Sequence, residues 1–123
     1  MKTLLLLVLS VIFSAIHPLQ EADYEFIACD QETKHVNERN EVSLIMINDL
    51  EEEVIIYWMN ARKQKTEYAR LFKGEEFPIN SATNHYWVLE TGSTCLGVIQ
   101  PKTSGDIHFS EFPQLDRGED DGD

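Results

Sequence analysis

Two side chains that could act together in catalysis, Ser81 and His85, lie close in the sequence, and three aromatic residues accompany them: Trp58, Tyr68 and Trp87. A serine beside a histidine could act as a nucleophile with its general base. Such a pair also needs a carboxylate that orients the histidine, and the sequence offers no identifiable candidate. On general grounds the tryptophans are more often core residues than walls of a site. The five residues alone therefore disfavour a hydrolase and leave a binding pocket open.

Other catalytic and metal-binding patterns are absent from the sequence. The four histidines (His17, His35, His85 and His108) are scattered, and no pair of them has metal-ligand spacing. No Cys-x-x-Cys pair, Gly-rich phosphate loop or Gly-x-Ser-x-Gly elbow is present. We therefore expect no enzymatic activity, no metal and no cofactor.

Short strands must position these side chains, because the chain has no helix-period segment of useful length. Runs of β-branched and aromatic residues alternate with turn signals such as Asn48-Asp49 and Ser104-Gly105. The expected strands are Tyr24–Ala28, Val42–Ile47, Val54–Met59, Tyr68–Phe72, Phe77–Ile79, Tyr86–Leu89, Leu96–Gln100 and Ile107–Phe112. Pro78 suits only an edge strand or an irregular segment. This spacing predicts an all-β domain, a small antiparallel β-sandwich or barrel of about seven short strands.

The two ends of the chain differ in composition from the strand-rich middle. Lys2 precedes an apolar run, Leu4 to Phe13, and small residues follow it, which is the layout of a secretory signal peptide. We expect this signal at residues 1–16, with cleavage after Ala15 or, less typically, as late as Ala22. The folded domain is then expected over residues 23–113. Residues 114–123 are rich in acidic residues and are expected to form a disordered, solvating tail.

Charge and cysteine content fit a secreted, extracellular chain. A net charge of −12 disfavours binding to nucleic acid or to an anionic membrane. No segment after the signal reaches the roughly 20 apolar residues of a membrane span. Cys29 and Cys95 allow one intramolecular disulfide, which would add up to about 4 kcal/mol of stability in the chain-entropy model. One free and one intermolecular thiol remain the alternative.

Three segments follow one another along the first half of the domain: His35-Val36-Asn37-Glu38-Arg39, Val42–Asn48 and Val54–Asn60, which contains Trp58. Together they resemble the β domain of the von Hippel–Lindau tumour suppressor family. The similarity extends through Tyr68, Leu71, Gly74, Ile79, Ser81, His85, Trp87 and the segment Thr94–Ile99. It runs without a gap across the pocket positions, so that Trp58, Tyr68, Ser81, His85 and Trp87 share one register.

The resemblance implies a binding pocket for 4-hydroxyproline. Trp58, Tyr68 and Trp87 would form walls around the pyrrolidine ring, while Ser81 and His85 would hydrogen-bond the hydroxyl, one as donor and one as acceptor. Aromatic walls suit such a ring, and two convergent polar groups suit a hydroxyl. Unmodified proline would leave both groups unpaired, at roughly 1–3 kcal/mol per group. Tyr68 would also contact the peptide backbone, as would two flanking residues, Asn37 and Arg39.

The chain also departs from that family. Asn80 and Asn84 replace His and Gly, and Ala61 replaces a larger apolar residue near the peptide groove. No segment corresponds to the helical domain that recruits elongin C, so we expect no elongin C and no ubiquitin ligase as partners. The expected function is secreted, non-enzymatic binding of a prolyl-hydroxylated peptide or protein, with collagen-like chains as the obvious source. The alternative is a secreted effector or venom-type protein that binds another target with the same scaffold.

Overall fold

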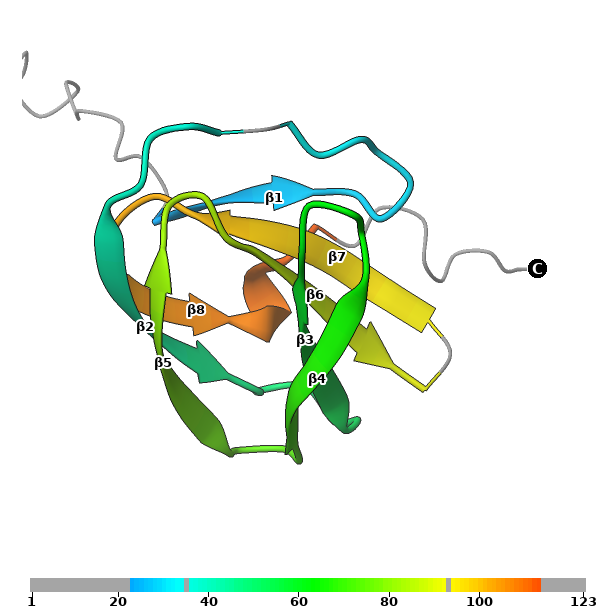
Figure 1. Ribbon diagram of the computed structural model, residues 1–123. Helices are drawn as coiled ribbons and strands as arrows, with labels where there is room; N and C mark the ends of the chain where they lie inside the picture. The colour runs from blue at the N-terminus through cyan, green and yellow to red at the C-terminus, as the bar shows by residue number, and fades with distance from the viewer. Residues whose placement is uncertain (1–22, 35, 93, 114–123) are drawn as a thin grey trace, which may run out of the picture.

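Two β-sheets packed face to face make up the fold of the computed structural model, which describes residues 23–34, 36–92 and 94–113 (Figure 1). The larger sheet has five strands in the order β1-β7-β6-β3-β4, and the smaller sheet has three in the order β5-β2-β8. The strands are β1 Tyr24–Ile27, β2 Glu41–Ile47, β3 Val54–Met59, β4 Lys65–Leu71, β5 Glu76–Ala82, β6 Tyr86–Thr91, β7 Thr94–Pro101 and β8 Gly105–His108. The expected all-β class is confirmed.

The core lies between the two sheets because apolar residues alternate along the strands. In β2, Val42, Leu44 and Met46 are buried and point at the larger sheet, while their neighbours are more exposed. Val54 and Ile56 of β3 belong to the same core cluster on the opposite sheet, and both are completely buried. This interior face is the one on which Trp87 also packs.

Two details of the smaller sheet differ from a simple antiparallel sandwich. The strand β8 pairs with β2 in parallel, so one pair of the fold departs from the expected antiparallel arrangement. The strand expected over residues 107–112 ends at His108 and is followed by a short 3-10 helix, η3 (Phe109–Glu111). The turn forms because Asp49 accepts hydrogen bonds from the backbone N–H and the hydroxyl of Ser110, each at 2.8 Å. It allows Phe109 and Phe112 to stack and to enter the core together.

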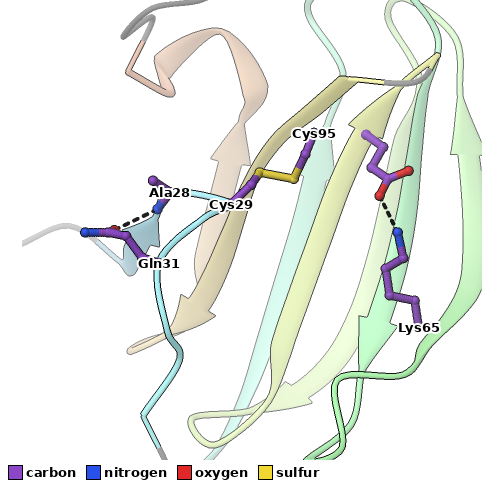
Figure 2. Close-up of a disulfide and its surroundings, with 6 residues drawn as sticks. Ala28, Cys29, Gln31, Lys65 and Cys95 are labelled. Atoms are coloured by element: carbon purple, nitrogen blue, oxygen red, sulfur yellow. Dashed lines mark hydrogen bonds and ion pairs between the residues drawn. A yellow bond between two sulfur atoms is a disulfide. The ribbon is translucent and has the colours of Figure 1, made fainter.

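The segment between β1 and β2 (residues 28–34 and 36–40), called the 28–40 segment below, turns back alongside β1 in Figure 1, and the Tyr86 hydroxyl holds it by a hydrogen bond to the Lys34 carbonyl. Ile27, Val88 and Val98 form a second, smaller apolar cluster on the outer face of the larger sheet. The predicted disulfide, Cys29–Cys95, fastens the segment to β7 (Figure 2). This segment matters for the site because it carries Asn37 and Arg39.

Other predictions concern residues outside the described part of the chain. The signal peptide at 1–16, its cleavage region up to 22 and the acidic tail at 114–123 all lie there. Within the described ranges, no helix is long and apolar enough to cross a membrane. Pro78 lies in β5, an edge strand, as expected for a residue that cannot donate a ladder hydrogen bond.

Candidate functional site

The five predicted pocket residues come together where β5 turns into β6. A turn closed by a hydrogen bond from the His85 N–H to the Ala82 carbonyl, at 3.0 Å, places Ser81 and His85 on the two sides of one bend. Trp87 follows in β6 and is paired directly with Trp58 of β3. The sequence spacing Ser-x-x-x-His-x-Trp therefore folds three of the side chains onto one another.

Ser81 is the centre of this cluster. Its hydroxyl oxygen accepts a hydrogen bond from the indole N–H of Trp87 at 2.9 Å, and it lies 3.1 Å from Nδ1 of His85. Both Ser81 and Trp87 are buried, at 6% and 2% exposure. A buried indole N–H needs a partner, so Ser81 has a structural role besides any contact with a ligand.

Arg39 determines which nitrogen of His85 carries the proton. Its Nη1 lies 3.3 Å from Nε2 of His85. A guanidinium can only donate, so Nε2 must accept and, in the neutral ring, the proton is on Nδ1. Nδ1 then donates to Ser81, whose oxygen receives two hydrogen bonds, and the Ser81 hydroxyl proton is left free to donate.

The same surroundings keep His85 neutral. Burial of the ring, and then the positive charge of Arg39, lower the pKa of His85 below its ordinary value. A general base would need a carboxylate at the nitrogen that Arg39 contacts, because a carboxylate stabilises the imidazolium that forms. The guanidinium has the opposite effect. Ser81 and His85 are therefore a hydrogen-bonded pair whose outer ring nitrogen contacts a guanidinium, at the place where a nucleophile and its base have a carboxylate.

The three aromatic residues of the cluster differ in how far they are exposed. Trp87 is buried, and Tyr68 packs edge-on against it with ring centroids 5.1 Å apart, while 53% of Tyr68 stays exposed. Trp58 is half-buried and packs edge-on against His85 at 6.2 Å. Trp58 lines the larger of the two hollows described below, whereas Tyr68 and Trp87 line neither of them. The role of these three rings as walls around a ligand stays a prediction.

A β-bulge, which sequence reasoning missed, directs Tyr68 into this cluster. In the β3–β4 pairing Ile56 is opposite Ala69 but Tyr57 is opposite Glu67, so Tyr68 is the extra, unpaired residue. In a regular strand the alternation would point Tyr68 and Ala69 to opposite faces. A bulge re-aims a side chain in this way, and bulges are common beside functional sites.

Two hollows open beside the cluster and meet at Arg39 and His85. One, of about 260 Å³, is lined by these two residues together with Ser81 and parts of β2 and β5. The other, of about 350 Å³, lies between the 28–40 segment and the β3–β4 turn, and Trp58 lines it. Asn37, the other predicted flanking residue, is exposed and lines neither of the two hollows.

The three residues that depart from the resemblance are placed around these hollows. Asn80 lines the smaller one, and Ala61 and Asn84 line the larger. Oδ1 of Asn84 is buried without a hydrogen-bond partner in the described part of the chain.

No group of His, Cys, Asp and Glu that could hold a metal ion occurs among the described residues. No protein-family model matches the chain, and no curated protein matches it.

Proposed function

We propose that the chain is a secreted, non-enzymatic β-sandwich module, similar to the von Hippel–Lindau β domain, that binds peptides containing 4-hydroxyproline. The observation that carries the proposal is the position of the Ser81 oxygen, 2.9 Å from the indole nitrogen of Trp87 and 3.1 Å from Nδ1 of His85. With the His85 proton on Nδ1, this oxygen accepts two hydrogen bonds and the Ser81 hydroxyl proton is free to donate. A hydroxyl donor beside a half-buried aromatic ring, Trp58, suits a hydroxylated ring. The Cys29–Cys95 disulfide is compatible with an extracellular location.

In the bound state, both polar groups would act as donors. The tautomer that Arg39 favours puts a proton on Nδ1 of His85, so the ligand oxygen would accept from His85 and from the Ser81 hydroxyl. The resemblance implies another division, with one group as donor and one as acceptor, which would need the proton of His85 on Nε2. Ser81 would keep its hydrogen bond from Trp87 throughout.

The tautomer also changes the expected penalty for unmodified proline. Ser81 and His85 can keep their mutual hydrogen bond beneath a proline ring. Only the Ser81 hydroxyl proton would then be buried without an acceptor, which costs roughly 1–3 kcal/mol. Two unpaired groups, as expected from the sequence, would cost about twice as much. A preference of between about fivefold and about 150-fold for hydroxyproline follows.

The peptide backbone would lie along β4. This strand is at the edge of the larger sheet, so its outer side has unpaired backbone groups. An extended peptide can add to such an edge, with main-chain hydrogen bonds for affinity and a pocket for specificity. Tyr68 lies on this strand and joins the edge to the pocket. Collagen-like chains would supply the residue, as single chains or exposed ends in which the ring is accessible.

The test is calorimetric titration of a short 4-hydroxyproline peptide into the protein and into His85→Ala. We expect His85→Ala to weaken binding about tenfold, since it removes one donor to the ligand oxygen and part of the wall at Trp58. His108→Ala is the matched control, because His108 contacts Asp49 instead and should leave affinity unchanged. If His85→Ala leaves the peptide affinity unchanged, the alternative holds, in which the same scaffold binds another target.

A further inference from the structure

The larger hollow concentrates positive charge in a strongly acidic protein. Lys34 and Arg39 of the 28–40 segment and Lys63 of the β3–β4 turn line it, and no Asp or Glu does. The chain has only 10 Lys and Arg residues against 22 Asp and Glu, so a cavity with three cations and no carboxylate is unusual for this surface. The composition of the hollow therefore favours an anionic ligand group.

The β3–β4 turn holds Lys63 in place at some conformational cost. Lys63 has a φ of +65°, the left-handed region in which glycine is favoured. Asn60 organises the turn: its carbonyl accepts from the Lys63 N–H, and its side chain accepts from the N–H groups of Arg62 and Gln64, all at 2.9 Å. A strained backbone at a site rim is a reason to look for a function of the side chain that it presents.

The opposite wall is fixed as well. The phenol of Tyr86 donates a hydrogen bond to the carbonyl of Lys34, which fastens the 28–40 segment over the end of β6. The disulfide at Cys29 anchors the beginning of the same segment. Both walls that carry the cations are therefore attached to the sheet.

Only one of the three lining cations has a carboxylate partner among the described residues. Lys63 pairs with Glu32 at 2.9 Å, with side-chain exposures of 51% and 88%. So exposed a pair contributes little, and a ligand carboxylate can displace or share it. The overall charge of −12 does not cancel this local effect, because exposed charges beyond about 8 Å are largely screened at physiological salt.

We propose that this hollow binds an acidic residue next to the hydroxyproline, so that the preferred ligand is an acidic hydroxyproline peptide. The proposal rests on the function proposed above and adds a second specificity element to it. Trp58 and His85 belong both to the hydroxyproline cluster and to the lining of the hollow, and Arg39, which contacts His85, lines it as well. An extended peptide that leaves the first would therefore enter the second within a few residues, at about 3.3 Å per residue.

The test compares two hydroxyproline peptides that carry either Glu or Gln on both sides of the ring. At about 0.05 M salt we expect the Glu peptide to bind roughly threefold to tenfold more tightly, and this ratio should fall as salt rises. Lys63→Gly should lower the ratio toward one while the protein keeps or gains thermal stability, because glycine relieves the positive φ. Glu32→Gln should raise the ratio, since it frees Lys63 from its partner.

Lys73→Gln is the matched control. It removes the same charge from a lysine that pairs with Glu51 and does not line the hollow, so it should leave the ratio unchanged. Equal affinity for the Glu and Gln peptides, or a ratio that Lys63→Gly leaves unchanged, would overturn the acidic specificity but not the hydroxyproline pocket. A Glu peptide with proline that binds as tightly as its hydroxyproline twin would overturn the proposed function instead.

Discussion

Replacing Ser81 by alanine should destabilise the fold as well as weaken binding. Ser81→Ala removes the acceptor of the Trp87 indole N–H, which is 2.9 Å away, in a side chain that is only 2% exposed. A buried donor left without an acceptor costs about 1–3 kcal/mol. For a domain of this size the midpoint of thermal unfolding should fall by about 4–8 °C for each kcal/mol. The loss of the Nδ1 partner adds little, because His85 is half-buried and can turn to water.

Urea unfolding followed by tryptophan fluorescence measures this cost, with the slope of the transition expected to stay constant. Ser43→Ala is the control, an equivalent change at an exposed position of β2, and should stay within about 0.5 kcal/mol of the unmodified protein. In a double-mutant cycle, Ser81→Ala should cost little once Trp87→Phe has removed the donor. A loss below about 0.5 kcal/mol for Ser81→Ala, or no coupling to Trp87, would refute the assignment of this hydrogen bond.

Three further outcomes are expected. Reduction of Cys29–Cys95 should lower the free energy of unfolding by up to about 4 kcal/mol, measurable as a shift of the urea midpoint with and without reductant. Burial and then Arg39 lower the pKa of His85, so peptide affinity measured across pH should be constant above about pH 6.5 and fall only as pH drops through the lower folded-state pKa. The fall is expected because a proton on Nε2 replaces the contact with Arg39 that positions the ring by a repulsion between two cations. Burial would raise the pKa of Asp49, but hydrogen bonds from its neighbours outweigh it and lower the pKa. Its stabilisation is present above about pH 4 and lost as pH falls, so Asp49→Asn should flatten the acid limb of thermal stability.

Much of the fold followed from the sequence because burial on one face imposes a period of two. The strand Val54–Met59 was predicted with its observed bounds, and Pro78 was correctly expected at an edge. The prediction for residues 107–112 was wrong because the turn at Ser110 depends on Asp49, which is distant in sequence. The parallel pairing of β8 with β2 likewise depends on where the chain returns after β7, and strand patterns do not specify this.

The candidate site was predictable as a set of residues but not as a geometry. The sequence brought Ser81, His85 and Trp87 together through their short spacing, and the predicted disulfide was confirmed. The bulge that turns Tyr68 inward leaves no clear signal in the residue types of β4. Arg39 lies beside His85 because of the path that the 28–40 segment takes, and this contact in turn favours one tautomer of the histidine. Such long-range contacts cannot be read from local patterns.

The most direct measurement is the affinity of the protein for one synthetic peptide containing 4-hydroxyproline and for its proline twin, under identical salt and pH. The hydroxyl proton of Ser81, left free by the hydrogen bonds from Trp87 and His85, leads us to expect the hydroxylated peptide to bind between about fivefold and about 150-fold more tightly. Equal affinities for the two peptides, or no binding of either, would contradict hydroxyproline recognition by this site.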